Sequence, residues 1–184
     1  MKNKLRVTGV FICVAIMICG YKLWDYQNTE YDEWYVQGSE TNAPTSLKMY
    51  YLLQKYSKEY NVPEYVAFNV AYLETGYKGP FHWTYNPHQR SSAGAVGPMQ
   101  IITRYAHKHA GRRVTETELK SDIELNIKVS MSMLSKLHDT YGRWDLVLGY
   151  YNTGYPQVNG YAEYASKNKN YKNKWVQLNR ASFL

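Results

Sequence analysis

The sequence of 184 residues contains no cysteine beyond position 19. Cys13 and Cys19 both lie in one apolar run near the N-terminus, so neither a disulfide framework nor a cysteine metal site can hold the main part of the chain together. Phenylalanine is also scarce, with 4 Phe against 20 Tyr and 5 Trp. Tyrosine and tryptophan offer flat faces with polar tips, which suit stacking on sugar rings or bases as well as half-buried surfaces.

Repeats and low-complexity tracts are absent, and the apolar–polar alternation of half-buried strands is scarce. The composition is 45% hydrophobic, which excludes disorder by composition, and the length suffices for one domain with a core. There are 22 basic and 15 acidic residues, which give a net charge of +7. This excess favours an anionic partner, such as nucleic acid, an anionic membrane or an acidic cell-wall polymer, but it does not choose among them.

The N-terminus carries Lys2, Lys4 and Arg6, followed by the apolar run VTGVFICVAIMICGY at residues 7–21. A basic start before an apolar run is typical of a signal sequence or a membrane anchor. The run is short for a spanning helix, which needs about 20 residues, but no clear small-residue cleavage site follows it. We therefore expect an uncleaved signal-anchor over residues 1–24, with a cleaved signal or a buried helix of the domain as the alternatives.

Residues 25–45 are polar, acidic and aromatic without a sustained period, as expected of a linker. The main domain is therefore expected over residues 46–184. Helical periodicity predominates there, and glycines follow several of the expected helix ends. The predicted helices cover residues 46–60, 63–75, 99–110, 123–141, 144–153 and 171–178.

The starts of three of these helices carry recognisable signals. Ser46 can cap the first helix, Pro63 suits the first position of the second, and Ser121 with Glu124 forms a candidate capping box before the long helix. The predicted class is mainly α, either without strands or with a minor hairpin in the loop over residues 76–98.

Glu74, near the end of the second predicted helix, is the candidate for acid chemistry. It lies four residues after Val70 and seven after Ala67, so it shares the apolar side of that helix. A carboxyl group at the end of an apolar stripe is partly desolvated, which favours its protonated form and makes it a general acid. The alternative is an ordinary exposed glutamate at a helix end.

Two further segments combine polar side chains with glycine. GAVGPMQI, residues 94–101, places Met99 and Gln100 directly after a glycine turn, as expected of a loop that passes close to a ligand. YYNTG, residues 150–154, joins a tyrosine hydroxyl and an asparagine amide at the end of an apolar helix. A simple helix cap is the alternative interpretation of this second segment.

The order of these segments resembles the soluble lytic transglycosylase family, whose members are relatives of goose-type lysozyme. Along the chain, a helix ends in Glu-Thr, SSAGAVGPMQI follows, DIELNI begins a long helix, and YYNTG comes last. The family carries Glu-Ser, Ser-x-x-Gly-Ala-x-Gly-Leu-Met-Gln-Ile, Asn-Ile and Ala-Tyr-Asn-Ala-Gly in the same order. The resemblance covers roughly residues 46–165.

The resemblance implies a lysozyme-like α fold and cleavage of the MurNAc–GlcNAc linkage of peptidoglycan, with no cofactor. It assigns the role of catalytic acid to Glu74 and places the glycine loop along one wall of the sugar cleft. The residues that it implies for substrate binding are Ser91, Met99, Gln100, Tyr151 and Asn152.

The chain departs most from the family pattern in the segment after Glu74. The family places Asn-Pro close behind the acid, whereas Asn86 and Pro87 come twelve and thirteen residues after Glu74. The additional stretch YKGPFHWT, residues 77–84, forms either a flap over the cleft or a surface loop. In a flap, Phe81, Trp83 or Tyr85 is expected to face sugar. Smaller departures are Thr75 for Ser, Pro98 for Leu, Tyr150 and Thr153 for two alanines, and Thr103 for a common proline.

The five histidines do not form a metal-binding pattern. His107 and His109 are two residues apart, a spacing that does not share a helix face, and no matched carboxylate cluster accompanies them. We therefore expect no metal, and solvated or loop histidines at His82, His88, His107, His109 and His138.

The expected function is that of a lytic transglycosylase in which Glu74 is the single acid and base. The alternatives are a hydrolytic lysozyme with Asp122 or Asp145 as a second carboxylate, and a non-catalytic assembly factor that binds the cell wall. Nucleic acid is not an expected partner, because no binding motif is recognisable and the basic residues are scattered. A small anchored wall enzyme would suit secretion, conjugation or phage machinery, or a role in lysis.

The basic residues before the apolar run predict that the main domain lies outside the cytoplasm, because positive flanks stay on the cytoplasmic side of a membrane. Protease added to spheroplasts should therefore digest the domain, while a cytoplasmic marker protein stays intact as the control for leakage. Protection of the domain until the cells are lysed would contradict this topology.

Overall fold

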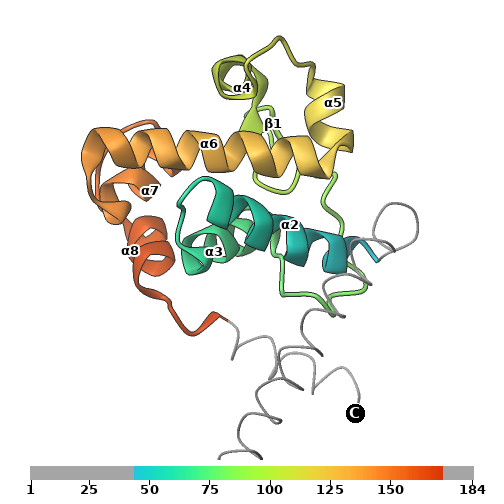
Figure 1. Ribbon diagram of the computed structural model, residues 1–184, viewed down its shortest axis with the longest axis horizontal. Coiled ribbons are helices and arrows are strands. Elements are labelled where there is room, and N and C mark those ends of the chain that lie inside the picture. Colours follow the sequence, from blue (N-terminus) through green and yellow to red (C-terminus); the bar gives the residue numbers. More distant parts are fainter. Residues whose placement is uncertain (1–43, 172–184) are drawn as a thin grey trace, which may run out of the picture. The chain divides into compact units, whose positions relative to one another are not determined.

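Figure 1 shows the computed structural model, which describes residues 44–171. This part of the chain contains seven helices and one hairpin of two short antiparallel strands, so the predicted mainly helical class is confirmed. The helices are α2 (Thr45–Glu59), α3 (Glu64–Thr75), α4 (Thr103–Ala110), α5 (Glu116–Ser121), α6 (Ile123–Tyr141), α7 (Trp144–Thr153) and α8 (Gly160–Lys167). The strands are β1 (Ala95–Val96) and β2 (Ile101–Ile102), with Ala95 opposite Ile102 and Val96 opposite Ile101.

The long helix α6 packs directly against α2, α4, α5 and α7, whereas α3 and α8 pack on each other and on α2 and α7 (Figure 1). α2 and α3 lie along one side of it, α4, α5 and β1 lie along the opposite side, and α7 and α8 lie at its C-terminal end. Ile127, Met131 and Leu134, spaced four and three residues apart, are fully buried on α6. Burial of such a stripe, rather than intrinsic propensity, stabilises most helices in proteins.

Glycines end four of the described helices, and for three of them this is as the sequence predicts. Gly76 ends α3, Gly142 ends α6 and Gly154 ends α7, with φ values of 71°, 67° and 80°. This left-handed conformation is open to glycine at no steric cost and terminates the helix. The end of α3 matters most, because Glu74 lies two residues before Gly76.

The helix predicted over residues 99–110 begins four residues later, at Thr103. Residues 101–102 instead pair with residues 95–96, and Gln100 turns the chain with a φ of 50°. Isoleucines favour a strand, and a residue in the left-handed region cannot continue an α-helix. The minor hairpin therefore exists, but its second strand lies beyond the loop in which it is expected.

Asp122, rather than the predicted pair of Ser121 and Glu124, caps the long helix α6. The Asp122 carboxylate accepts a hydrogen bond from the backbone N–H of Leu125 over 2.9 Å. Ser121 is the last residue of α5, and its hydroxyl donates to the Thr117 carbonyl. A residue in helical conformation cannot act as the extended N-cap of the next helix, and for this reason the prediction is wrong.

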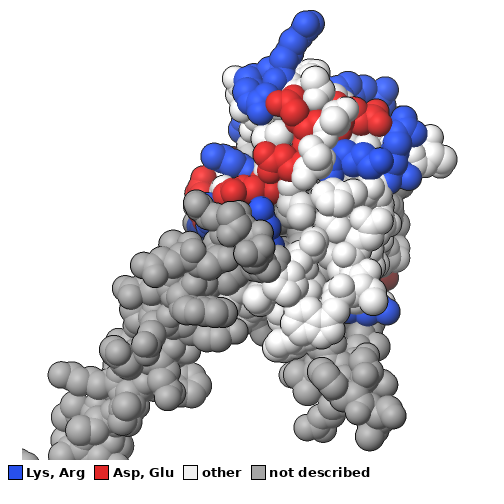
Figure 2. Space-filling view, turned by 90° about the vertical axis from the view of Figure 1, so that its right-hand side faces the viewer, with Lys and Arg blue, Asp and Glu red and all other residues white. Residues whose placement is uncertain are grey.

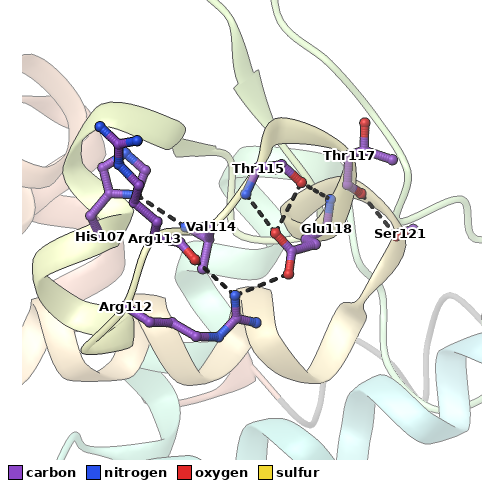
Figure 3. A network of polar contacts seen from close by, with 8 residues as sticks. All are labelled: His107, Arg112, Arg113, Val114, Thr115, Thr117, Glu118 and Ser121. Atoms are coloured by element: carbon purple, nitrogen blue, oxygen red, sulfur yellow. Dashed lines mark hydrogen bonds and ion pairs between the residues drawn. The ribbon is translucent and has the colours of Figure 1, made fainter.

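The short helix α5 is missing from the sequence prediction, although its start carries a complete capping box (Figure 3). The Glu118 N–H donates to Thr115 Oγ1 over 3.1 Å, and the Thr115 N–H donates to the Glu118 carboxylate over 2.7 Å. Arg112 donates to the same carboxylate over 3.0 Å. The Thr-x-x-Glu pattern is readable in the sequence, but a helix of six residues is too short to show periodicity.

The first two helices begin close to their predicted starts, but with different caps. α2 starts at Thr45, and the Ser46 hydroxyl does not cap it but donates to the Pro80 carbonyl over 2.8 Å. Ser46 is almost completely buried, so its hydroxyl requires an internal partner. Pro63 is the N-cap of α3 rather than its first helical residue.

The helix α8 is also missing from the prediction, because small residues, Ala162 and Ala165, make up its buried face and give little periodic signal.

The signal-anchor expected over residues 1–24 lies outside the described residues, as does the helix expected over residues 171–178 apart from Tyr171. Between residues 44 and 171, no helix has the length and apolar character required to cross a membrane.

Gly149 lies where α7 meets the segment that leads to α8. A Cβ at this position would lie 1.7 Å from the Gln157 carbonyl oxygen, so a side chain must displace that segment. We expect Gly149→Ala to lower the free energy of unfolding by about 2–3 kcal/mol or more, measured by urea unfolding followed by circular dichroism.

Gly160→Ala is the matched control for this variant, because a Cβ at Gly160 would have no neighbour within 4 Å. It should change the free energy of unfolding by less than about 1 kcal/mol. Equal losses in the two variants would contradict the close approach at Gly149.

Candidate active site

Glu74 lies in the last turn of α3 and is half-buried. Burial raises the pKa of its carboxyl group from 4.5 to about 7. The last turn of α3 contains no basic residue, and the negative end of the helix dipole also disfavours a carboxylate there. A carboxyl group with a pKa near 7 holds a proton in about half of the molecules at neutral pH, so it can donate a proton and take one up again.

Tyr161, from α8, provides a hydrogen bond to this carboxyl group. Its hydroxyl donates to Glu74 Oε1 over 2.7 Å, and this bond lowers the pKa of Glu74 in part, opposing the effect of burial. Burial and the nearby Glu74 carboxylate raise the pKa of Tyr161 well above its usual value. Tyr161 therefore stays a neutral donor at physiological pH.

A buried asparagine fastens α8 to α3 and so brings Tyr161 to Glu74. The Asn69 amide, on α3, donates to the carbonyls of Ala165 and Asn168 over 3.2 and 2.8 Å. It also accepts a hydrogen bond of 3.0 Å from the Asn168 side chain. Leaving such a buried amide without partners would cost about 1–3 kcal/mol. These three bonds therefore hold α8 in one position relative to α3.

Sequence reasoning misses Tyr161. It is one of 20 tyrosines, and it lies 87 residues after Glu74, so no helical spacing connects the two. The only local signal is Asn159, whose side chain accepts from the Ala162 N–H and begins α8. That signal predicts a helix start but not what the helix faces.

Tyr151, a predicted substrate-binding residue, joins α7 to the glycine loop and to α6. Its hydroxyl donates to the Met99 carbonyl over 2.6 Å and lies 3.0 Å from Ser130 Oγ. Burial raises the pKa of Tyr151, and the neighbouring Glu74 carboxylate raises it further. Tyr151 therefore belongs, uncharged, to the immediate surroundings of the acid.

Asn126 of α6 holds the glycine loop in place and is fully buried. Its amide donates to the carbonyls of Val96 and Leu119 over 2.9 and 3.0 Å, and its oxygen accepts from the Met99 N–H over 3.0 Å. A Cβ at Gly97 would lie 2.2 Å from the Asn126 amide nitrogen. Glycine is therefore required at position 97 because the loop backbone runs directly against Asn126.

The two residues after this turn have different exposures. Met99 is fully buried, so its side chain belongs to the core and its carbonyl is the group that meets Tyr151. Gln100 is half-buried and has a positive φ, which costs a non-glycine residue about 1 kcal/mol or more. Its amide donates to the Gly97 carbonyl over 2.9 Å.

Ser91 and Asn152, the other two predicted substrate-binding residues, make local bonds. The Ser91 hydroxyl accepts from the Ala95 N–H over 3.0 Å. Asn152 is exposed, and its side-chain oxygen accepts from the Asn159 amide over 3.2 Å. Tyr151 thus interacts electrostatically with Glu74 without a hydrogen bond to it, whereas Ser91 and Asn152 make local hydrogen bonds away from the acid.

Thr75, directly after the acid, fastens the insert that follows it. Its hydroxyl lies 2.9 Å from the Pro98 carbonyl and 2.7 Å from the hydroxyl of Tyr85. Tyr85 is 7% exposed, so of the three aromatic candidates it is not one that faces sugar: its ring packs in the core, and its hydroxyl lies against Thr75. Phe81 and Trp83, in contrast, are exposed.

The two candidate second carboxylates have other partners. Asp122 caps α6 through the Leu125 N–H. Asp145 accepts two hydrogen bonds from Arg143, at 2.7 and 3.2 Å, and this guanidinium lowers the pKa of Asp145 below its usual value. Neither carboxylate makes a contact with Glu74 or Tyr161 among the described residues.

The histidines each have a separate local partner. The ring nitrogen of His107 accepts from the Val114 N–H, and the ring of His138 stacks on Trp144 at 4.3 Å. A group of three potential metal ligands is not found within residues 44–171.

Charges of both signs are interleaved on the face shown in Figure 2, at the end that α4 and α5 form in Figure 1. Exposed ion pairs at α5 join Arg90 to Glu116 at 2.8 Å and Arg112 to Glu118 at 3.0 Å. Such exposed pairs contribute about 0–1 kcal/mol each. The basic excess of the chain is therefore not gathered into one continuous patch on this face.

A family model of the transglycosylase SLT domain matches residues 51–174. The chain belongs to this family. The resemblance found from the ordered motifs is thereby confirmed, and it extends to the whole of α3, the glycine loop, α6, α7 and α8. No curated protein matches the chain. Membership supports a lysozyme-like or lytic transglycosylase action on peptidoglycan at the level of the family.

The raised pKa of Glu74 predicts how the stability of the protein depends on pH. A carboxyl group whose pKa is raised on folding contributes full stability below its unfolded pKa of 4.5, and this contribution is lost as the pH rises to about 7. Glu74→Gln does not titrate. The free energy of unfolding of this variant, relative to that of the unaltered chain, should therefore rise by on the order of 2–3 kcal/mol between pH 4 and pH 8.

Urea unfolding at each pH measures this difference. Glu59→Gln is the control, because Glu59 is an exposed residue at the end of α2. The free energy of unfolding of this control variant should stay close to that of the unaltered chain at each pH. A Glu74→Gln difference that is constant from pH 4 to pH 8 would mean that the carboxyl group is not buried as described.

Proposed function

We propose that the chain is a peptidoglycan lytic transglycosylase that cleaves the β-1,4 linkage between MurNAc and GlcNAc and forms 1,6-anhydroMurNAc. The observation that carries the proposal is the half-buried Glu74 carboxyl group, with a pKa of about 7 and a hydrogen bond from Tyr161, in a chain of the SLT family. Glu74 is the single acid and base of the reaction.

In the first step, protonated Glu74 donates its proton to the glycosidic oxygen. Because Tyr161 occupies Oε1, the proton is donated from Oε2. The bond between MurNAc C1 and this oxygen breaks, and the GlcNAc-bearing strand leaves with a hydroxyl group. The positive charge that develops at C1 is stabilised by the N-acetyl group of the MurNAc itself.

In the second step, the Glu74 carboxylate takes the proton from the MurNAc 6-hydroxyl. The 6-oxygen attacks C1 and closes the 1,6-anhydro ring, so Glu74 ends protonated as it began. No water is consumed, and a second carboxylate is not needed, unlike in ordinary glycosidases. Tyr161 stabilises the carboxylate that exists between the two steps, through the hydrogen bond that already lowers its pKa in part.

Tyr151, Ser91 and Gln100 position the sugar and its N-acetyl group in this proposal. Support for Tyr151 comes from its place beside Glu74 and at the carbonyl of Met99. Gln100 adds support through its strained backbone, because strain of this kind collects at ligand sites. Met99 and Asn152 belong to the same wall of the sugar cleft in this proposal, and Met99 contributes to it through its backbone.

The domain acts outside the cytoplasm in this proposal, held at the membrane by residues 1–24. Its substrate is the glycan strand of peptidoglycan, and its partners are secretion, conjugation or phage machinery that has to pass the wall. The basic residues before the apolar run support the orientation.

Glu74→Gln should abolish cleavage of purified sacculi while leaving the fold intact. Glutamine is nearly isosteric but cannot supply the proton, and general acid–base catalysis is typically worth about 10²–10⁴ in rate. Asp122→Asn and Asp145→Asn should cost far less, because no water has to be activated. The rates are measured by release of soluble fragments, with circular dichroism as the control for folding.

Mass analysis of the fragments separates the two reactions, because hydrolysis adds a water molecule and formation of the anhydro ring does not. Near-normal turnover of Glu74→Gln would remove the catalytic assignment. Hydrated products, together with an aspartate variant that loses as much as Glu74→Gln, would establish a hydrolytic lysozyme instead.

A further inference from the structure

The insert over residues 77–84 carries a pair of exposed aromatic rings that neither the core nor the acid accounts for. Phe81 is 52% exposed and Trp83 is 58% exposed. Their ring centroids are 5.8 Å apart, with the edge of one ring toward the face of the other. Single exposed apolar residues are common on protein surfaces, but two adjacent large rings on one loop are typical of a contact surface.

The insert is fastened on both sides of this pair. Before it, the Tyr77 hydroxyl donates to the Ser46 carbonyl over 2.7 Å, and the Ser46 hydroxyl donates to the Pro80 carbonyl over 2.8 Å. After it, the buried hydroxyl of Tyr85 lies 2.7 Å from Thr75 Oγ1. A ligand that meets rings on such a fastened loop loses little of its binding free energy to ordering the loop.

The same bonds hold the pair between the end of α3 and the start of α2. Thr75, which holds Tyr85, is the residue directly after Glu74. Trp83 lies two residues before Tyr85, and two residues of extended chain span at most about 7 Å. The aromatic pair therefore lies on the loop that directly follows the helix carrying the acid.

The neighbours of the two rings are polar. Lys78 and Thr84 are exposed, and His82 is half-exposed between the rings in sequence. A surface that alternates rings with hydrogen-bonding groups matches a sugar, which has an apolar ring face and a rim of hydroxyl and amide groups. A surface made for lipid would carry a continuous apolar face, as interfacial helices do.

We propose that Phe81 and Trp83 form a stacking surface for an amino-sugar ring of the glycan strand, beyond the two sugars at the cleaved bond. This inference rests on the proposed action on peptidoglycan. The surface binds the strand equally before and during the reaction, so it sets how tightly the substrate is held and not how fast the bond breaks.

The binding experiment uses the full chain with Glu74→Gln, so that the glycan is not consumed, and purified sacculi as the probe. Adding Phe81→Ala and Trp83→Ala should raise the dissociation constant roughly tenfold, as loss of a central aromatic contact does. Tyr105→Ala is the matched control, because Tyr105 is 49% exposed on α4 and contacts Arg104, and it should leave binding unchanged. Unchanged binding of the Phe81 and Trp83 variant would overturn the inference.

Kinetics of the active chain provide a second measurement. Phe81→Ala with Trp83→Ala should raise KM and leave kcat unchanged, because a contact made equally in the ground state and the transition state affects KM alone. A loss confined to kcat would overturn the inference. If the unaltered chain neither binds nor cleaves sacculi, the proposed function fails as well; if it does both and the double variant is normal, only the stacking surface is wrong.

Fluorine NMR distinguishes sugar from membrane. In the full chain labelled with 5-fluorotryptophan, the resonance that is missing from Trp83→Phe belongs to Trp83. Soluble oligomers of N-acetylglucosamine should shift this resonance. A shift with phosphatidylglycerol vesicles and none with the oligomers would overturn the inference in favour of a membrane-contacting loop.

Discussion

The burial of the Glu74 carboxyl group is the constraint on which the arrangement around it depends. Its pKa of about 7 means that the carboxylate is less stable in the folded protein than in water, so the fold keeps this group at a cost in free energy. Tyr161 offsets part of that cost by one hydrogen bond of 2.7 Å. The balance between burial and this bond gives a group that both releases and accepts a proton near neutrality.

This balance requires that α8 stay in place, because Tyr161 is useful only within hydrogen-bonding distance of Glu74. Apolar packing is not directional, and the buried face of α8 consists of two alanines. The hydrogen bonds of Asn69, which are directional, fix the helix instead. Asn126 does the same for the glycine loop, because it binds Val96 of the hairpin, Met99 of the loop and Leu119 of α5 at once. Two buried amides thus specify where the surroundings of the acid lie.

The other carboxylates near the helix starts have structural functions. The Asp122 carboxylate accepts a backbone hydrogen bond at the start of α6, and the Asp145 carboxylate is paired with Arg143 at the start of α7. A mechanism with one acid is consistent with this distribution, since Glu74 is buried with a raised pKa, whereas Asp122 and Asp145 are bound to partners of their own. The insert after α3 adds aromatic surface without adding a carboxylate, which agrees with a function in holding substrate.

The sequence by itself determined the helices whose signals are local. The apolar periodicity of α6 and the glycines at the ends of α3, α6 and α7 are enough to place these elements, because each signal lies within a few residues of the structure that it specifies. The ordered motifs also identified the family and singled out Glu74 and Tyr151. Short or weakly apolar elements were missed or misplaced: α5, α8 and the hairpin that replaces the start of the helix expected at Met99.

Only the tertiary structure decided which side chains meet. Tyr161 reaches Glu74 across 87 residues, Asn69 reaches Asn168 across 99, and Tyr151 reaches Met99 across 52. It also distinguished the aromatic residues of the loop after α3, since Tyr85 is buried while Phe81 and Trp83 are exposed, although all three look alike in sequence. The physical reason is that burial depends on the packing of distant segments, and a pKa or a hydrogen bond between such segments exists only once that packing has formed.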